Sequence, residues 1–277
     1  MYHEIRRLYP GGKPRAFNIS YDDGILQDVR FVALLNRYGL KGTFNLNSGL
    51  MEPPFTWTHE CGMDVTRLGP AAARELYRGH EVASHTLMHP YMHDLSEPEV
   101  MHQLAADKRN LEELFGREIS GFAVPFTYCS ELTAQCARNC GFEYARISEE
   151  SHTYQPSSDY YHWRGSIFHW TDGLEGFVEG FLHTDTELAL CQIVGHSYDL
   201  DVFDMWERME AIFQRVSSDP SIWPATHIEI IRYLKAMEMA AVTEDGIHNH
   251  SGIDLWFSID GQVVCVLSGQ QYHRNEQ

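Results

Sequence analysis

Two adjacent carboxylates and three histidines stand where apolar, strand-like segments of this 277-residue chain end. Asp22 and Asp23 close one segment, His85 and His89 follow a second, and His196 follows a third. Adjacent carboxylates repel each other, and burial raises the cost of keeping both charged. A divalent cation held by one carboxylate and two imidazoles would offset this repulsion and leave coordination positions open for water. The second carboxylate would then accept the proton of an attacking water, which is the chemistry of a metal-dependent hydrolase.

Each of these motifs has a simpler explanation when it stands alone. Asp and Gly favour turns, so an Asp-Asp-Gly segment occurs without any site. The chain holds 16 histidines, and about one pair spaced four residues apart is expected from chance. A second such pair exists because His93 follows His89, and only the four-residue spacing from His85 favours His89 as its partner. The joint placement of the motifs at several strand ends favours a site.

Strand-like and helix-like segments alternate along most of the chain. The expected strands cover residues 15–20, 41–47, 80–85, 120–125, 142–148 and 188–197. The expected helices cover residues 26–40, 66–79, 95–116, 131–141, 204–216 and 224–238. This alternation predicts parallel strands joined by right-handed crossovers, which close or nearly close into a barrel. In such barrels the chemistry lies on the loops that follow the strands.

Two segments depart from this alternation. The stretch from Glu149 to Trp170 is rich in aromatic residues and histidines, and it is either a sugar-facing loop or a flank that packs on the barrel. The final segment alternates like an antiparallel hairpin around Asp260 and Gly261. We therefore expect an α/β chain with a (β/α) barrel over residues 1–238. Residues 239–277 would form a short C-terminal β appendage that packs on the barrel and is not an independent domain.

The composition argues against several classes of partner. The formal net charge is −18, which repels phosphate backbones and anionic membranes, so we expect neither nucleic acid nor a membrane as a partner. No segment approaches the roughly 18 apolar residues of a spanning helix, and the first residues lack the apolar core of a signal peptide. The six cysteines include no Cys-x-x-Cys pair. These features predict a cytoplasmic protein with free thiols, and they leave its oligomeric state open.

Four segments, SYDDG, SHTLMHP, GFAVPFTY and IVGHS, resemble in order and spacing the motifs of the polysaccharide deacetylase family. This family is also called carbohydrate esterase family four or the NodB-homology domain. The resemblance extends from about residue 14 to residue 235. It implies a distorted (β/α)7 barrel, in agreement with the alternation of strands and helices. It also implies that Asp23, His85 and His89 are the metal ligands and that Asp22 is the general base.

The resemblance implies further roles for residues on later loops. His196 would be the general acid that protonates the leaving amine, and the N–H of Phe126, which follows Pro125, would help to hold the oxyanion. The chain departs from the family pattern at Ala123, where many members carry an arginine that orients the base. In place of a tryptophan-bearing acidic motif after the fifth strand stands YARIS. We hypothesise that Arg146 in this segment supplies the positive charge near the base, and the effect of the missing arginine on activity stays open.

The implied function is metal-dependent hydrolysis of a non-peptide C–N bond. The favoured reaction is N-deacetylation of an acetylated sugar or oligosaccharide with release of acetate. The alternatives are hydrolysis of a cyclic amide or ureide, and a catalytically weak barrel that binds carbohydrate. The expected cofactor is a divalent metal ion, with zinc favoured and cobalt, nickel or iron also suited to two histidines and a carboxylate. The expected partner is a small carbohydrate or amide substrate, whose identity and acyl group stay open.

Overall fold

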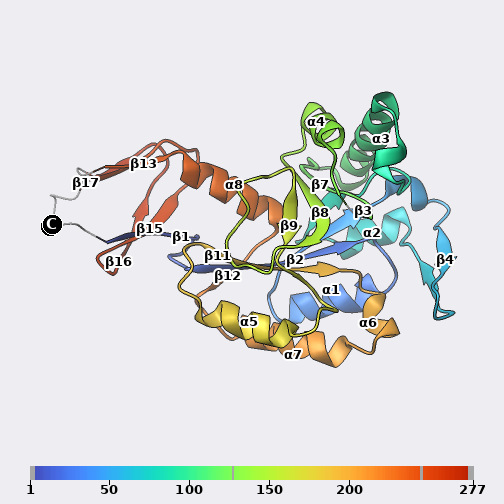
Figure 1. Ribbon diagram of the computed structural model, residues 1–277, viewed down its shortest axis with the longest axis horizontal. Coiled ribbons are helices and arrows are strands. Elements are labelled where there is room, and N and C mark those ends of the chain that lie inside the picture. Colours follow the sequence, from blue (N-terminus) through green and yellow to red (C-terminus); the bar gives the residue numbers. More distant parts are fainter. Residues whose placement is uncertain (1–3, 127, 244–245, 274–277) are drawn as a thin grey trace.

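A nine-stranded sheet forms the centre of the molecule (Figure 1). The structure is a computed structural model that describes residues 4–126, 128–243 and 246–273. The strands of the central sheet are, in chain order, β2 (Arg15–Asp22), β3 (Gly42–Leu46), β6 (Glu81–Ser84), β7 (Gly121–Ala123), β8 (Tyr144–Glu150), β9 (Trp163–Gly165), β10 (Ile167–Phe168), β11 (Ala189–Gly195) and β12 (Ile222–Pro224). In space they follow the order β10-β11-β2-β3-β6-β7-β8-β9, and β12 pairs with β2. Neighbouring strands are parallel throughout, which confirms the predicted α/β class.

The two ends of this sheet are joined by the chain itself. Only Ser166 separates β9 from β10. The Ser166 N–H donates to the carbonyl of Gln192 on β11 at 2.9 Å, and the Gln192 N–H donates to Ser166 Oγ at 2.9 Å. The path through the sheet therefore returns to its start at Ser166. No strand pairing between β9 and β10 or β11 occurs in the part of the chain that the structure describes, so a closed seven-stranded barrel stays a prediction.

Helices cover the sheet, and most begin and end close to the predicted residues. They are α1 (Asp28–Arg37), α2 (Pro70–Leu76), α3 (Glu97–Phe115), α4 (Glu131–Asn139), α5 (Leu174–His183), α6 (Asp199–Val202), α7 (Trp206–Ser217) and α8 (His227–Glu238), with short 3-10 turns η1 (Ser48–Leu50) and η2 (Met92–Asp94). α3 begins at a capping box formed by Ser96 and Glu99, and it ends at Gly116, whose φ of 64° is left-handed. On α1, the ring of Phe31 stacks on Tyr21 of β2, with ring centroids 4.2 Å apart. Contacts of this kind bury the apolar face of the helix against the sheet.

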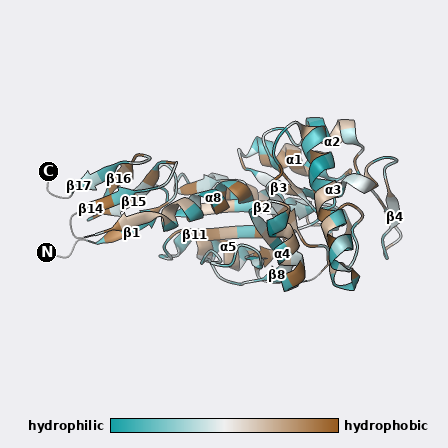
Figure 2. Ribbon diagram, turned by 90° about the horizontal axis from the view of Figure 1, so that it is seen from above, coloured by the Kyte–Doolittle hydropathy of each residue, from teal (hydrophilic) through white to brown (hydrophobic). Residues whose placement is uncertain are grey.

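Two small antiparallel sheets lie together at one end of the molecule (Figures 1 and 2). One contains β1 (Ile5–Leu8), β15 (Leu255–Ile259) and β16 (Gln262–Val266), and the other contains β13 (Ala240–Val242), β14 (Gly246–Asn249) and β17 (Gln271–His273). The β15–β16 hairpin turns at Asp260 and Gly261, both with positive φ, as the sequence predicts. The pairing of β1 with β15 was not predicted, and it brings the beginning of the chain into this region. The division at residues 238 and 239 stays a prediction.

A second apolar core connects the small sheets to the central sheet. Tyr233 of α8 lies in one buried cluster with Phe257 of β15, Ile247 of β14 and Trp163 of β9. The Tyr233 hydroxyl also donates to the carbonyl of Leu8 on β1 at 2.5 Å. α8 therefore packs against both parts of the molecule.

The sequence did not predict two further elements. The strands β4 (Thr56–Thr58) and β5 (Asp64–Thr66) form an antiparallel hairpin. It projects at the end of the molecule opposite the small sheets (Figures 1 and 2). α5 lies within residues 148–187, where no helix was expected. In the described ranges, no helix combines the length and the apolar character needed to cross a membrane.

Candidate active site

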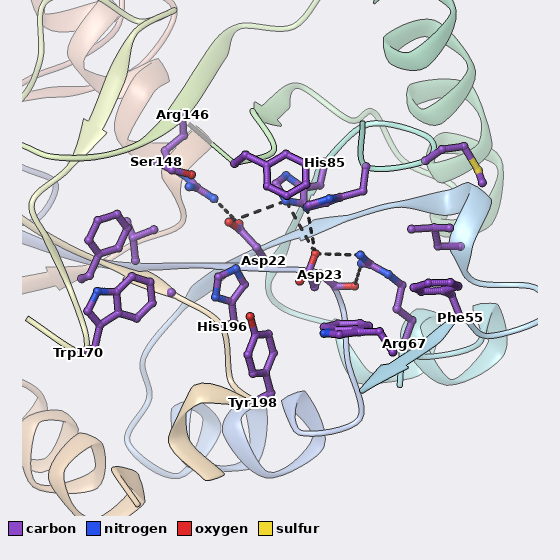
Figure 3. Close-up of a pocket in the computed structure, with 18 residues that line it drawn as sticks. Asp22, Asp23, Phe55, Arg67, His85, Arg146, Ser148, Trp170, His196 and Tyr198 are labelled. Atoms are coloured by element: carbon purple, nitrogen blue, oxygen red, sulfur yellow. Dashed lines mark hydrogen bonds and ion pairs between the residues drawn. The ribbon is translucent and has the colours of Figure 1, made fainter. Parts of the chain in front are cut away.

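A cavity of about 800 Å³ opens at the carboxyl ends of the parallel strands (Figure 3). The ends of β2, β6, β7, β8 and β11 and the loops that follow them line one part of it, and the β4–β5 hairpin, the η1 turn and the loop after β10 line the rest. Asp22, Asp23, His85, His89 and His196 all line this cavity. The fold thus brings together the five residues that their types and spacing single out, at the end of the strands where barrel chemistry is expected.

Asp22 is the last residue of β2 and is almost fully buried. Arg146 Nη2 donates to Asp22 Oδ1, and Asn45 Nδ2 donates to the same oxygen at 2.7 Å. Burial would raise the pKa of Asp22, but the charges of Arg146, His85 and His196 outweigh burial and hold this pKa below its ordinary value. Asp22 is therefore an ionised carboxylate in a dry site, which is the state that a general base requires.

Arg146 approaches Asp22 from the strand next to the family's arginine position. It lies on β8 directly opposite Ala123 of β7, and both residues are fully buried. The positive charge that is missing at residue 123 is thus present one strand away.

Asp23 follows with a left-handed backbone, at a φ of 81°. Arg67, the residue after β5, donates from Nη2 to Asp23 Oδ1 at 3.0 Å and from Nη1 to the Asp23 carbonyl oxygen at 2.5 Å. Burial would raise the pKa of Asp23, but Arg67 and the imidazoles of His196, His89 and His85 outweigh burial and hold the pKa well below its ordinary value. Asp23 is therefore also a carboxylate, with its own arginine.

Asp23, His85 and His89 form a group whose possible ligand atoms all lie within 4.8 Å of one another. Nε2 of His89 lies 3.6 Å and Nε2 of His85 lies 3.9 Å from Asp23 Oδ1. These distances are too long for hydrogen bonds, so the three side chains face one another unbonded, as ligands of one ion do. His85 Nδ1 lies 2.8 Å from the carbonyl oxygen of Ala123, which favours the proton on Nδ1 and leaves Nε2 free to ligate. One carboxylate and two imidazoles fit a zinc-type divalent cation.

Several residues of these loops have an unusual backbone conformation. Positive φ angles occur at Asp23 (81°), Thr86 (70°), His89 (55°) and Phe126 (67°). Such conformations cost about 1–3 kcal/mol for residues with a side chain, and they persist at sites where the surroundings enforce them. Asp23, Thr86 and His89 lie on the loops after β2 and β6, which present the ligand group, and Phe126 lies on the loop after β7.

His196 lies across the cavity from the ligand group (Figure 3). Its Nδ1 is 3.0 Å from Asp199 Oδ2, and the same oxygen lies 3.5 Å from Nε2 of the buried His169. Burial would lower the pKa of His196, but the hydrogen bond to Asp199 and the negative charges of Asp23, Asp199 and Asp22 raise this pKa to about 9. His196 is thus protonated at neutral pH, as a general acid must be.

The other predicted residues have different surroundings. His93 is well exposed, and its Nε2 lies 3.3 Å from Asp94 Oδ1 rather than in the ligand group. The geometry therefore favours His89 over His93 as a ligand. Phe126 lines the cavity and stacks on Tyr91, with ring centroids 3.8 Å apart, while Pro125 is buried.

Aromatic side chains form two walls of the cavity. Phe55 and Trp57 stack at 6.3 Å between ring centroids, and Phe168 and Trp170 stack at 4.6 Å. Phe55 and Trp170 lie on opposite sides of the two aspartates (Figure 3). In the stretch from Glu149 to Trp170, Trp163 is buried in the core, as the packing interpretation predicts, and Trp170 lines the cavity. Contact of this stretch with a sugar stays a prediction.

Sequence reasoning missed Arg67, Asn45, Asp199 and His169. Asp199 had a signal, because it follows His196 by three residues, a spacing that allows a carboxylate to reach the imidazole within one turn. The other three lie on distant segments and had no spacing signal.

Comparisons with known proteins identify a family match and a shared fold. A family model described as polysaccharide deacetylase matches residues 11–145. No curated protein matches the chain in sequence. The chain is 20% identical to a Streptococcus pyogenes deacetylase in complex with acetate, over 47% of this chain and 55% of that one, with a TM-score of 0.42. It thus spans only about half the length of that protein.

Other solved structures share the fold over most of the chain. A candidate polysaccharide deacetylase from Mycobacterium smegmatis is 15% identical over 86% of this chain and 96% of that one, with a TM-score of 0.61. A family 4 acetyl xylan esterase from Clostridium thermocellum in complex with a cobalt ion is 15% identical, over 79% and 91%, with a TM-score of 0.51. A family 4 pseudoenzyme from Bacillus anthracis is 14% identical, over 82% and 68%, with a TM-score of 0.51. Residues 11–145 of the chain thus match the polysaccharide deacetylase family in sequence, and most of the chain shares the fold of the solved structures.

Proposed function

We propose that this protein is a metal-dependent hydrolase of a C–N amide bond that removes an N-acetyl group from a sugar or oligosaccharide. The observation that carries the proposal is the set of side chains that line the cavity at the carboxyl ends of the strands. A metal-ligand group, an ionised carboxylate beside it and a protonated imidazole opposite are the parts that amide hydrolysis requires.

Asp23, His85 and His89 would hold the metal. A divalent cation bound there would polarise the amide carbonyl and acidify a water molecule. Zinc suits this ligand group, and cobalt, nickel and iron suit it as well. The remaining steps belong to side chains and backbone groups of this chain.

Asp22 and His196 would move the two protons. Asp22 takes a proton from the water whose oxygen attacks the amide carbon, and Arg146 keeps Asp22 charged for this task. His196 donates its proton to the amide nitrogen as the C–N bond breaks. The products are acetic acid, which ionises to acetate by releasing a proton to solvent, and a free amine. Asp22 has gained a proton and His196 has lost one, so Asp22 returns its proton to solvent and His196 takes one up before the next turnover. The N–H of Phe126, following Pro125, would stabilise the oxyanion between these two steps.

The two aromatic walls support a sugar substrate, because aromatic rings pack against the apolar faces of sugar rings. One observation favours a second candidate, a barrel that binds carbohydrate with little turnover. Ala123 stands at the position of the family's arginine, and Arg146 would have to replace it fully.

The test combines metal content with acetate release. We expect wild type to bind one zinc per chain, His89→Ala to lose it, and His93→Ala to keep it, because His93 has the same spacing but lies outside the ligand group. Wild type loaded with zinc should release acetate from at least one member of a panel of N-acetylated sugars. Opening of a cyclic amide without acetate would support the cyclic-substrate alternative. Zinc binding with sugar binding but no turnover would support the weak barrel.

A further inference from the structure

Arg67 connects the metal-ligand group to the β4–β5 hairpin. We propose that Arg67 is a positioning residue of the metal site, whose guanidinium fork holds Asp23 and Asn47 in the conformations that the ligand group needs. The inference rests on the proposed metal site and goes beyond it, since Arg67 is neither a ligand nor a proton donor or acceptor in the proposed reaction.

The first part of the argument is the contact between Arg67 and Asp23. The Arg67 side chain is 5% exposed, and its two donations to Asp23 engage both the carboxylate and the backbone carbonyl. The oxygen that accepts from Nη2 is Oδ1, which is also the oxygen facing Nε2 of His89 and of His85. The fork therefore fixes the side-chain rotamer that points Oδ1 at the imidazoles, together with the left-handed backbone of Asp23.

The second part is Asn47, which extends the contact to the histidine loop. Arg67 Nη1 donates to Asn47 Oδ1 at 2.7 Å. Asn47 Nδ2 in turn donates to the carbonyl of Thr86 at 2.8 Å and to that of His85. Asn47 is buried, so bulk water does not compete with Arg67, Thr86 and His85 for these hydrogen bonds. A continuous chain of contacts thus runs from Arg67 to the loop that presents both histidines.

The third part is the hairpin that carries Arg67. The Arg67 N–H donates to the carbonyl of Phe55 at 3.0 Å, and its backbone forms a bridge with Ile25, two residues after Asp23. The guanidinium lies 5.4 Å from the centre of the Trp57 ring. Arg67 therefore connects the hairpin both to the loop that carries Asp23 and to Trp57 of the aromatic wall.

Charge and geometry act in opposite directions at this position. A guanidinium beside a ligand carboxylate repels a divalent cation, so a neutral replacement would remove both the repulsion and the positioning. Lysine keeps the positive charge but lacks the rigid fork that reaches several acceptors at once. Arg67→Lys therefore isolates the geometric contribution.

The experiment is a titration of metal-free full-length protein with Zn²⁺ in competition with a chelator of known affinity. We expect Arg67→Lys to bind one zinc with an affinity about tenfold or more below that of wild type. Arg232→Lys is the matched control, because Arg232 on α8 also contacts several acceptors, Glu143, Glu118 and Ser120, but lies outside the cavity. Its zinc affinity should equal that of wild type. Circular dichroism checks that the variants fold.

The outcomes separate this inference from the proposed function. If wild type binds one zinc and Arg67→Lys binds it equally well, the inference is wrong and the metal site stands. If wild type binds no zinc, both this inference and the proposed metal-dependent function are wrong. If Arg67→Lys does not fold, Asn47→Ala serves instead, with weaker zinc binding expected and unchanged affinity overturning the inference. Where all variants fold, the double variant Arg67→Lys/Asn47→Ala should lose less zinc-binding free energy than the sum of the losses of the two single variants, because the two residues act in one chain of contacts.

Discussion

Each of the two adjacent aspartates has its own buried arginine, and we propose that the two carboxylates have different tasks. Arg146 binds Asp22, and Arg67 binds Asp23. Both arginines keep their carboxylate ionised despite burial. Asp23 Oδ1 lies near Nε2 of both His85 and His89, whereas Asp22 Oδ2 lies 3.9 Å from Nε2 of His85 and Asp22 is outside the ligand group. This difference supports Asp23 as the proposed ligand and Asp22 as the proposed base.

This division of tasks predicts the effect of Asp22→Asn. An asparagine keeps an oxygen for the donors Arg146 and Asn45, so the fold and the metal content should be retained. It has no basic lone pair to take a proton from water, so kcat should fall by about 10²- to 10⁴-fold. Zinc content and acetate release measured on the same preparations check this prediction. Wild-type turnover in the variant would assign the base to another residue.

A second prediction concerns Asp199, which holds His196 protonated. The pKa of His196 is raised to about 9, so activity should decline as the pH rises through the pKa of this acid. Asp199→Asn removes one negative charge and the hydrogen bond to a carboxylate, which lowers the pKa of His196. The alkaline limb of the kcat/KM profile should therefore move to lower pH in the variant. An unmoved limb would show that another group controls it.

At the scale of elements, the register of the β7–β8 pair supports the hypothesis that Arg146 supplies the positive charge that Ala123 lacks. Residues opposite each other on parallel strands project to the same face of the sheet. Ala123 and Arg146 are such a pair, so a guanidinium on β8 reaches a region that a side chain on β7 would otherwise occupy. The sequence allowed the hypothesis that Arg146 compensates for Ala123, but the register that makes it plausible appears only in the folded sheet.

The end of β11 gives a prediction about packing behind the acid. A Cβ at Gly195 would lie 2.1 Å from Nδ1 of His169. This Nδ1 shares a hydrogen bond of 2.7 Å with the Tyr21 hydroxyl, and Nε2 of the same ring lies 3.5 Å from Asp199 Oδ2. Gly195→Ala should displace this ring, lower the free energy of unfolding by about 1–3 kcal/mol and reduce kcat by disturbing Asp199. Gly176→Ala on α5 is the control, because its Cβ meets no atom within 4 Å. Urea denaturation and acetate release of both variants check this, and equal stability for the two would refute it.

Local patterns predicted the elements that depend on local sequence. Capping residues and apolar periodicity located α3, and strand-end motifs located Asp22 and His85. α5 was missed although Leu174, Val178 and Phe181 share one helix face, because Gly176 and Gly180 lower its helix propensity.

The other features that the sequence did not predict are contacts between segments that lie far apart along the chain. The partner of β1 is β15, near the other end of the sequence, and no local pattern specifies that pairing. Arg67 likewise reaches Asp23 only after the β4–β5 hairpin forms and folds back on the ligand loop. Such roles depend on tertiary structure, so residue type and spacing alone do not reveal them.

At the scale of the whole molecule, buried acids that are not proposed metal ligands tie stability to pH. Burial raises the pKa of Glu81 to about 7, although bonds from the Ile228 N–H, the Tyr144 hydroxyl and the Thr43 hydroxyl favour its charged form. Burial likewise raises the pKa of Asp28 to about 6. These two groups bind protons more tightly in the folded state, so their own contribution to stability should be greatest at acid pH and fall as the pH rises.

Glu81→Gln tests this link. For wild type, the contribution of Glu81 is lost between its unfolded-state pKa and a folded pKa of about 7. Glutamine accepts the Thr43 and Ile228 donors with its oxygen and does not titrate. The variant should therefore lose less stability than wild type between about pH 5 and about pH 8, by on the order of 2 kcal/mol. Urea denaturation at both pH values measures the difference, with the exposed Glu113→Gln as control. Equal pH dependence in all three proteins would mean that Glu81 is already ionised in the folded protein at the lower pH, and that its three hydrogen bonds offset its burial.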